Sequence, residues 1–253
     1  MVQPARASRQ DENLRRMRLL VSQMPAVDLV LLPENWLGPF SVALEDYLRA
    51  LDEIAALLPP ETLLAGGAQY VDEGGRFYSR GYFLRHAARL AFYEKCFPSQ
   101  AVGERDHLLP GRPTPVLEHA GWKLGALVCI DLFYPEVARW LALQGAQLIL
   151  NPVSIHAGRS SFWQALGQVR AAENTVFVAV ANNTGSAYPD GREVTGGSFV
   201  ALPDGRLGAV AGSEETVLLA TLDAGLVEDV RKRWPYLEDA RRGELRRFCS
   251  PGS

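Results

Sequence analysis

The sequence predicts an α/β protein with mixed β-sheets, folded as a single domain over residues 1–253. Three observations lead to this fold class. Apolar, β-rich runs alternate with amphipathic stretches along most of the chain. Hairpin-like pairs of runs occur beside helices long enough to connect parallel strands, which favours mixed pairing. No break in composition, linker or internal repeat divides the chain.

The first half of the chain is expected to contain one helix and four strands. The helix covers residues 12–22, and the apolar run at 26–32 indicates a buried strand that ends before Pro33. A second strand is expected at 62–71, where Gly66 and Gly67 indicate a close approach of another backbone. Residues 77–84 and 89–95 are typical of a hairpin, because aromatic and apolar side chains recur along both.

The second half alternates more regularly. The sequence predicts a helix that begins near Pro135 and stops at Gly145, which are favoured residues at those two ends. The turn at 203–205 separates two of the strands and contains Pro, Asp and Gly. The predicted strands are 122–129, 147–150, 176–181, 198–202, 207–210 and 216–222, and the predicted helices are 135–144 and 160–173.

The two ends of the chain differ from this regular pattern. The chain shows no apolar strand before the first predicted helix, only Met1-Val2. Either the fold lacks an initial strand, or the start codon was placed late and the first strand has lost its beginning. Residues 228–253 are charged and rich in arginine, and we expect them to form a C-terminal extension.

The composition excludes several classes of protein. Apolar residues make up 47% of the chain and charged residues 22%, with a formal net charge of −3, which excludes disordered, collagen-like and coiled-coil chains. A pI near 5.9 argues against nucleic acid as a partner. No apolar run reaches the ~18 residues of a membrane span, and residues 1–18 lack a signal-peptide core. We therefore expect a cytoplasmic protein that binds neither membranes nor nucleic acid.

Cofactor motifs are also missing from the sequence. The nucleophile elbow Gly-x-Ser-x-Gly, the dinucleotide motif and the phosphate loop do not occur. The four histidines, at 86, 107, 119 and 156, form no metal-binding pair. The three cysteines are too few and too scattered for a disulfide framework or a zinc site. We therefore expect neither a metal nor an organic cofactor.

Cys129 is the strongest candidate for a functional residue. It closes an apolar run, and a helix begins a few residues later. A thiol near a helix N-terminus has a lowered pKa, which makes the nucleophilic thiolate available. The alternative is a buried core cysteine, which is the more common situation for this segment taken alone. We assign Cys96 and Cys249 to that alternative.

Two charged residues close apolar runs in the same way. Glu34 follows the strand at 26–32, where a carboxylate beside apolar walls has a raised pKa and suits a general base. Lys95 ends the strand at 89–95 and is one of only three lysines among 26 basic residues. Each has a simpler interpretation, a turn glutamate and a solvated lysine, and Glu104 is equally compatible with an ordinary loop. Together, however, Cys, Glu and Lys at one end of a sheet would suffice for acyl transfer.

Taken in order, these residues resemble the nitrilase superfamily, the carbon–nitrogen hydrolases, whose Glu–Lys–Cys triad has the same order. The resemblance covers about residues 12–222, and the ordered set is specific where one motif alone would be weak. The motifs are Leu31-Leu32-Pro33-Glu34-Asn35, Tyr93-Glu94-Lys95, Cys129-Ile130-Asp131, Tyr134-Pro135-Glu136, Gly145-Ala146, Asn151-Pro152, Arg170-Ala171-Ala172-Glu173-Asn174, 182–185 and Gly197-Ser198.

The resemblance implies a role for each candidate. Cys129 would be the nucleophile, Glu34 the general base and Lys95 the cation that stabilises the oxyanion. The backbone N–H of Ile130 would be a second oxyanion donor, and Glu104 would position the substrate or the attacking group. The implied fold is a four-layer α-β-β-α sandwich, usually paired as a homodimer through helices and C-terminal segments. The implied reaction is hydrolysis of a small linear amide at a non-peptide C–N bond, without a cofactor.

Several alternatives stay open. The acid after Cys129-Ile130 is Asp131, whereas true nitrilases tend to carry Cys-Trp-Glu, so amides are favoured over nitriles. Residues 134–139 also resemble the branch that cleaves N-carbamoyl compounds. Ile130 replaces a frequent aromatic residue, a change that keeps the backbone donor. From other classes, an inactive binding or assembly protein and a Cys–His acyltransferase or protease are possible.

Substrate specificity is expected to depend on loops at 36–40, 155–162 and 187–194. Trp36 and Trp163 lie in or next to these loops, and we expect both to belong to the core rather than to a pocket.

Overall fold

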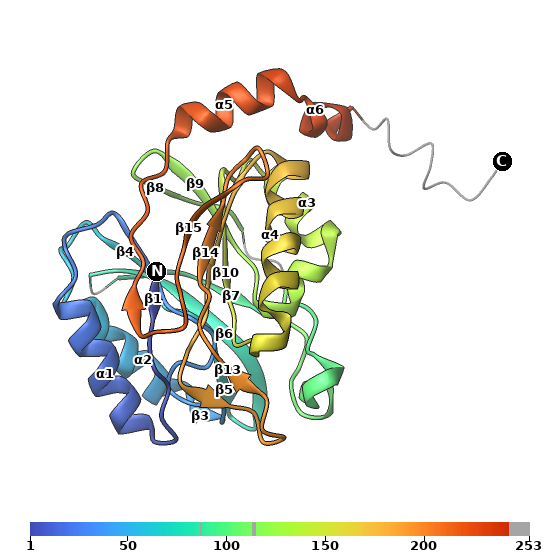
Figure 1. The fold of residues 1–253 in the computed structure, drawn as a ribbon. Coiled ribbons are helices and arrows are strands. Elements are labelled where there is room, and N and C mark those ends of the chain that lie inside the picture. Colours follow the sequence, from blue (N-terminus) through green and yellow to red (C-terminus); the bar gives the residue numbers. More distant parts are fainter. Residues whose placement is uncertain (87, 113–114, 243–253) are drawn as a thin grey trace.

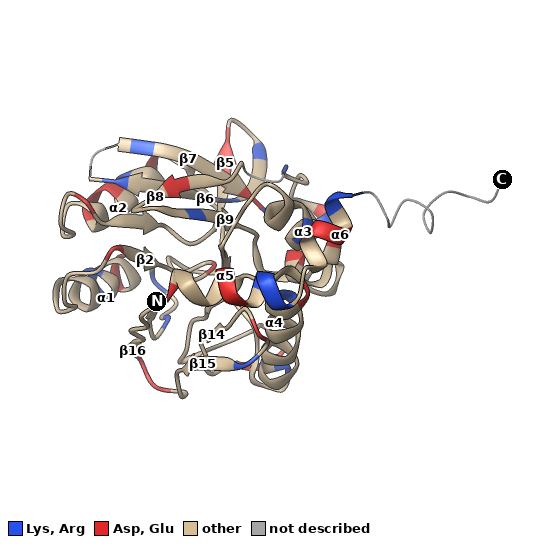
Figure 2. Ribbon diagram, turned by 90° about the horizontal axis from the view of Figure 1, so that it is seen from above, with Lys and Arg blue, Asp and Glu red and all other residues tan. Residues whose placement is uncertain are grey.

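Two sheets lie face to face between two pairs of helices (Figure 1). The computed structural model describes residues 1–86, 88–112 and 115–242. Seen from above, α1 (Gln10–Ser22) and α2 (Leu44–Ala55) lie on one outer side of the sheets, and α3 (Pro135–Leu143) and α4 (Ser160–Asn174) lie on the other (Figure 2). This arrangement confirms the four-layer α-β-β-α sandwich with mixed sheets that the resemblance implied.

The first sheet packs against α1 and α2. In spatial order its strands are β2 (Leu29–Leu31), β4 (Leu63–Ala65), β6 (Arg76–Arg85), β5 (Gln69–Glu73) and β3 (Val42–Ala43), and β7 (Ala88–Glu94) also pairs with β6. β2 runs parallel to β4, whereas β4 and β5 run antiparallel to β6. β6 and β7 form the predicted hairpin.

The second sheet packs against α3 and α4. In spatial order its strands are β15 (Leu207–Val210), β14 (Phe199–Ala201), β11 (Phe177–Ala181), β10 (Leu148–Pro152), β9 (Trp122–Ala126) and β8 (Leu117–His119). β9, β10 and β11 are parallel, so their carboxyl ends meet at one edge of the sheet. In such sheets this edge is the usual place for a ligand site.

The alternation of side chains along β2 explains why its sequence is apolar throughout. Val30 and Leu32 pack with Met17 of α1 and Tyr47 of α2. Leu31 points the other way, into the core between the two sheets. Because successive side chains of a strand face opposite sides, a strand covered on both faces needs apolar residues at every position.

Short elements complete the structure. Two small antiparallel pairs join distant segments, β1 (Val2–Gln3) with β16 (Thr216–Val217) and β12 (Ser186–Ala187) with β13 (Glu193–Val194). Single turns of 3₁₀ helix are η1 (Gln100–Val102), η2 (Glu104–Asp106), η3 (Cys129–Phe133) and η4 (Ala157–Arg159). The chain therefore does begin with a strand, although a very short one.

One predicted strand is divided in the structure. The run at 62–71 forms β4 and β5, with Gly66 and Gly67 between them. Gly67 has a φ of 74°, and a Cβ there would lie 2.1 Å from the carbonyl oxygen of Pro33. The close backbone approach predicted at this pair is therefore present. The chain turns here just before Ala68, which forms a parallel bridge with Glu34.

The end of the strand predicted at 122–129 was also wrong. β9 stops at Ala126, and Cys129 begins η3 instead of closing the strand. The physical cause is the carboxylate of Asp131, which accepts the backbone N–H of Val128 at 3.1 Å and so removes that donor from the sheet.

The expectation that regular structure finishes with a strand at 216–222 was wrong as well. β16 contains two residues, and α5 (Ala224–Arg233) and α6 (Tyr236–Arg241) follow it. Asp223 caps α5 by accepting a hydrogen bond of 2.8 Å from the N–H of Gly225. Most of the side chains here are charged, but Val227 is buried against the core. Residues 243–253 of the predicted extension, including Cys249, lie outside the described residues.

Helix α2 was not predicted. Its buried residues recur at helical spacing, from Tyr47 through Leu51 to Ile54, and acidic residues occupy its first turn.

A cavity of about 580 Å³ lies at the amino end of the sandwich, between Met1, Leu29, Trp122 and Leu148. None of the described helices is long and apolar enough to cross a membrane.

Candidate active site

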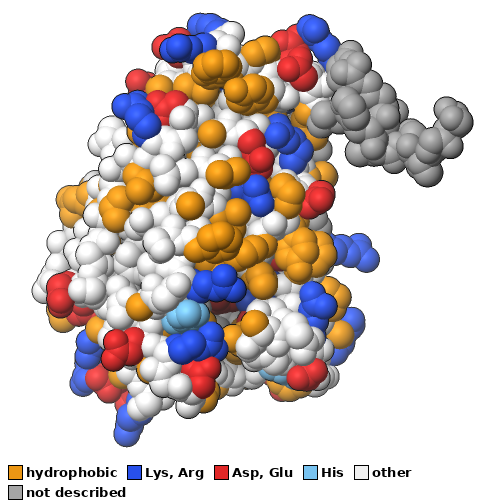
Figure 3. Space-filling view, turned by 45° about the vertical axis from the view of Figure 1, so that its right-hand side comes forward, with side chains coloured by type: hydrophobic (Ala, Val, Ile, Leu, Met, Phe, Trp, Pro, Cys, Tyr) orange, Lys and Arg blue, Asp and Glu red, His pale blue; other side chains and the backbone are white. Residues whose placement is uncertain are grey.

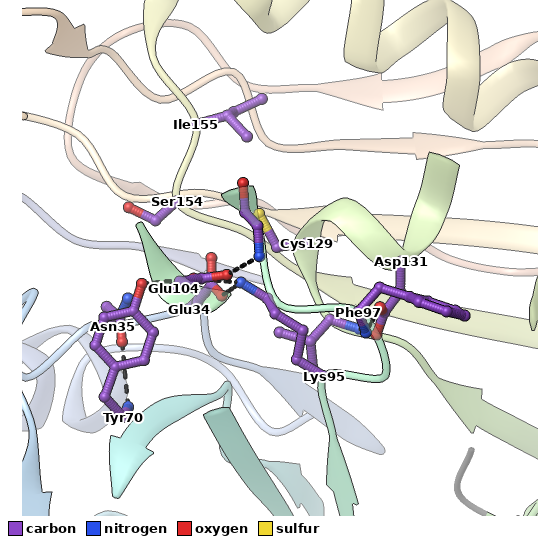
Figure 4. A network of polar contacts seen from close by, with 12 residues as sticks. Glu34, Asn35, Tyr70, Lys95, Phe97, Glu104, Cys129, Asp131, Ser154 and Ile155 are labelled. Carbon is purple, nitrogen blue, oxygen red and sulfur yellow. Dashed lines mark hydrogen bonds and ion pairs between the residues drawn. The ribbon is translucent and has the colours of Figure 1, made fainter. Parts of the chain in front are cut away.

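Glu34, Lys95 and Cys129 come together beyond the carboxyl ends of the strands β2, β7 and β9. Glu34 follows β2, Lys95 comes directly after β7, and Cys129 begins η3 after β9. Figure 4 shows the three side chains pointing toward one another, with Glu104 beside them. The convergence inferred from three separate strand ends is therefore present in the structure.

The Lys95 ammonium bridges two carboxylates. Its Nζ lies 2.7 Å from Oε1 of Glu34 and 2.6 Å from Oε1 of Glu104. All three side chains are 2–3% exposed. Because an ammonium group has three N–H donors, one donor of Lys95 stays available for a third acceptor.

Glu104 is held more completely than Glu34. Its Oε1 also accepts the hydroxyl of Tyr70 at 2.6 Å, and its Oε2 accepts the backbone N–H of Ser99 at 2.6 Å. These bonds occupy both carboxylate oxygens, which makes Glu104 a poor proton acceptor and a good anchor for Lys95. Glu34 is therefore the better candidate for a general base.

The backbone around Glu34 is fixed from both sheets. Its N–H donates to the carbonyl of Val153 at 3.2 Å, and its carbonyl accepts from Nδ2 of Asn183 at 2.7 Å. The next residue, Asn35, has a φ of 53°, and its N–H donates to the carbonyl of Ala68. The base is thus carried on a turn that bonds to both sheets.

Cys129 lies on a strained turn. Its φ of 49° is unusual for a residue other than glycine, and such strain is concentrated at functional sites. The side-chain amide of Asn151 donates to the carbonyls of Leu127 and Cys129, at 3.1 and 3.3 Å. Because η3 begins at Cys129, the N–H of Ile130 lies in its first turn, where helical N–H groups have no partner within the helix.

Asp131 connects the segment that carries the thiol to the segment that carries the ammonium. Its buried carboxylate accepts the backbone N–H groups of Cys96 and Phe97, both at 2.9 Å, in addition to that of Val128. Burial raises the pKa of Asp131 to about 7 despite these donors. Since Cys96 follows Lys95 directly, Asp131 ties the segment of Lys95 to the segment of Cys129.

The environment shifts the pKa of every group in the cluster. Burial, followed by the charge of Glu34, raises the pKa of Cys129 well above its usual value, so the expectation of a lowered pKa was wrong. Burial also raises the pKa of Glu34, although Lys95 opposes the shift. Burial alone would lower the pKa of Lys95, but the neighbouring negative groups outweigh it and raise that pKa. For Glu104, burial would raise the pKa, but the charge and hydrogen bond of Lys95 and the hydrogen bonds from Tyr70 and Ser99 together outweigh it and lower the pKa.

Comparison with known proteins decides the family. The profile of the family described as carbon-nitrogen hydrolase matches residues 1–232, most of the chain. The chain belongs to the carbon–nitrogen hydrolases. It is therefore an amide-hydrolysing enzyme of the nitrilase superfamily, as the resemblance of its motifs implied.

Individual relatives of this hydrolase support the same family. A protein of Pseudomonas protegens named "Hydrolase in pqqF 5'region" is 34% identical over 92% of this chain and 84% of its own. The 2-oxoglutaramate amidase of Bacillus subtilis is 28% identical over 91% of this chain and 92% of its own. Among solved structures, a mutant amidase of Nesterenkonia sp. AN1 with acrylamide added at its active-site cysteine superposes with a TM-score of 0.79. It is 27% identical and covers 99% of this chain and 98% of that one.

Three residues that the sequence analysis assigned to the core are buried. Cys96 is buried and Trp36 and Trp163 belong to the core, with exposures of 8%, 1% and 5%. The strongest charge effects on Cys129 come from Glu34, Lys95 and Glu104, and no histidine is among them. In the described part of the chain, no group of three or more His, Cys, Asp or Glu side chains is arranged to hold a metal ion.

Three residues of the site were not singled out from the sequence. Tyr70 lies inside a predicted strand and carried no separate signal. Ser154, whose backbone hydrogen-bonds Cys129, lies one residue before the predicted specificity loop at 155–162. Tyr188, inside the loop at 187–194, donates its hydroxyl to the carbonyl of Ser154. The two loops could be identified as important from the sequence, but not the side chains within them.

Proposed function

We propose that this hydrolase cleaves the non-peptide C–N bond of a small linear amide through a thioacyl intermediate on Cys129. The observation that carries the proposal is the buried cluster of a thiol, a carboxylate that hydrogen-bonds this thiol, and an ammonium with one unused donor. The relatives named as amidases support an amide substrate over a nitrile.

In the first step, Glu34 takes the proton of the Cys129 thiol while the sulfur attacks the carbonyl carbon. A free thiolate beside two carboxylates is unfavourable, as the raised pKa of Cys129 indicates. Transfer to Glu34 avoids this cost, because one negative charge disappears as another forms. The remaining N–H of Lys95 and the N–H of Ile130 then stabilise the tetrahedral oxyanion.

The second half of the reaction reverses the proton movement. Protonated Glu34 gives its proton to the departing nitrogen as the C–N bond breaks, which leaves a thioester on Cys129 and releases ammonia or an amine. Water then attacks the thioester with Glu34 again as base. The C–S bond breaks, the acid leaves, and the proton returns to sulfur.

Acid-quenched intact mass spectrometry with a panel of amides tests the proposal. We expect an acyl adduct on the peptide that contains Cys129, and Cys129→Ala should abolish both adduct and turnover. Cys96→Ala is the matched control, because Cys96 is also buried and has a pKa raised to about 12 by burial. Turnover by Cys129→Ala would refute the assignment. Parallel release of ammonia from amides, nitriles and N-carbamoyl amino acids identifies the preferred bond.

We also propose that the enzyme acts as a homodimer. α5 and α6 lie across the top of the sandwich at the end of the described chain, where Val227 and Leu237 pack into the core (Figure 1). Trp234 and Tyr236 at their junction are 45% and 44% exposed, and Phe162 and Val169 of α4 are 46% and 52% exposed. Such exposed apolar groups are compatible with a partner surface. Light scattering coupled to gel filtration should give twice the 27.8 kDa of one chain.

A further inference from the structure

Two buried carboxylates share one ammonium in the site, and the proposed reaction needs them to behave differently. Glu34 has to accept the proton of the thiol, whereas Glu104 has to keep its charge beside Lys95. On one face of the molecule acidic side chains lie at the surface beside basic ones (Figure 3), where water can donate hydrogen bonds to them. Glu34 and Glu104 are each 2% exposed, so the protein itself has to supply the donors that make them differ.

Without Tyr70 the two carboxylates would have matching partners among the described residues. Nζ of Lys95 lies 2.7 Å from Glu34 and 2.6 Å from Glu104. Each carboxylate has one further donor, which is the catalytic thiol for Glu34 and a backbone N–H at 2.6 Å for Glu104. The hydroxyl of Tyr70 lies 2.6 Å from Oε1 of Glu104 and has no counterpart at Glu34 in the described chain. This hydroxyl therefore makes the two environments unequal.

Tyr70 is held by the two segments that carry these carboxylates. Its backbone N–H donates to Oδ1 of Asn35, the residue after Glu34, at 3.3 Å. Its ring meets the ring of His107, the residue after η2, edge-on at 6.2 Å between centroids. Figure 4 shows Tyr70 beside Asn35 with its hydroxyl toward Glu104. Tyr70 therefore presents its hydroxyl to Glu104 from a fixed position.

The groups around this hydroxyl favour its protonated form. Burial, together with the charges of Glu104 and Glu34, raises the pKa of Tyr70 well above its usual value, and the opposing charge of Lys95 does not offset this. Arg6 is a second cation close enough to interact with Tyr70. The phenol therefore stays a hydrogen-bond donor at neutral pH, and Glu104 stays its acceptor.

We propose that Tyr70 is a positioning residue that decides which of the two carboxylates accepts the proton during the reaction. This inference rests on the amide hydrolysis proposed above, with Glu34 as the base. A hydrogen bond to an ionised group stabilises the ionised form, so Tyr70 keeps Glu104 negative. A negative Glu104 shares the charge of Lys95 and repels negative charge on Glu34, and both effects make Glu34 the better proton acceptor. Without the hydroxyl, the two carboxylates would compete for the proton.

The test compares the wild type with Tyr70→Phe, which removes only the hydroxyl, by ammonia release from the amide of the panel above that the wild type hydrolyses best. The two carboxylates titrate as a pair, so the acid limb of kcat/KM reports an apparent pKa of the pair. Loss of a donor to the ionised pair favours protonation. We therefore expect this apparent pKa to rise by about 1–2 units, the range for a hydrogen bond to a charged group. Above the limb, kcat should fall while KM stays nearly unchanged.

Tyr93→Phe is the matched control. Tyr93 is also buried, but its hydroxyl donates to the backbone carbonyl of Gly67 at 2.7 Å and not to a carboxylate, so the acid limb should stay in place. In the Glu104→Gln background only Glu34 titrates, and Tyr70→Phe should no longer move the limb. An unmoved limb in Tyr70→Phe, the same shift in Tyr93→Phe, or an equal shift in the Glu104→Gln background overturns the inference but keeps amide hydrolysis. Failure of the wild type to hydrolyse any amide would overturn both proposals.

Discussion

Replacement of Lys95 by Met should damage both stability and catalysis, for separate reasons. The ammonium is 2% exposed and lies 2.6 and 2.7 Å from two buried carboxylates. At an effective dielectric constant of ~20, two unit charges at such a distance attract by about 6 kcal/mol. After desolvation is counted, removal of one partner of a buried ion pair costs about 3–5 kcal/mol. For a chain of this size this corresponds to a melting temperature lowered by roughly 6–20 °C.

Catalysis should fall independently, because the oxyanion loses a donor, and such donors contribute on the order of 10²–10³ in rate. The double variant Lys95→Met/Glu104→Gln separates the two effects. It removes the second uncompensated carboxylate, so thermal unfolding should return toward the wild type while the rate of amide hydrolysis stays low. The reasoning is refuted if the single variant melts like the wild type, or if the double variant regains its rate.

Three further outcomes follow from the same geometry. Glu34 must be ionised to act as the base, and burial raises its pKa. We therefore expect kcat/KM to fall with decreasing pH at an apparent pKa above the usual 4.5 of a glutamate. A pH–rate profile with an apparent pKa at or below 4.5 would contradict the assignment. Glu34→Gln should lose at least ~10² in rate with a nearly unchanged melting temperature, and full activity would exclude it as base. Asp131→Asn presents an NH₂ group to backbone N–H donors. It should lower the free energy of unfolding by about 1–3 kcal/mol in denaturant titrations and should also lower the rate of amide hydrolysis. An unchanged midpoint of denaturant unfolding would refute the role of Asp131 in linking the two segments.

The fold was predictable where burial on both faces makes a strand apolar throughout, as at β2 and β11. It was less predictable where tertiary contacts decide the structure. β3 and β12 contain two residues each, and no sequence pattern is long enough to identify them. α2 has apolar residues at helical spacing, which a prediction from sequence can use, whereas α5 and α6 are covered mostly by charged residues and depend on a few buried apolar contacts.

The site was predictable to the extent that its residues follow strands. Glu34, Lys95 and Cys129 each come shortly after an apolar run, so their convergence could be argued before any coordinates were known. Tyr70 could not be found in this way. It lies within β5 and reaches Glu104 because the fold brings two distant segments together. Such contacts follow from topology and leave no local pattern.

The raised pKa of Cys129 shows which of two opposing effects is larger. A helix N-terminus contributes typically 0.3–1 kcal/mol, which is less than the 1.36 kcal/mol of one pKa unit. Burial shifts a pKa by up to 3–5 units, and the charge of Glu34 acts here in the same direction. The thiol is therefore protonated at rest, and its reactivity depends on a base that can accept the proton at the moment of attack. For this reason the decisive feature of the site is the Glu34 carboxylate that hydrogen-bonds the thiol, and not the position of Cys129 at the start of η3.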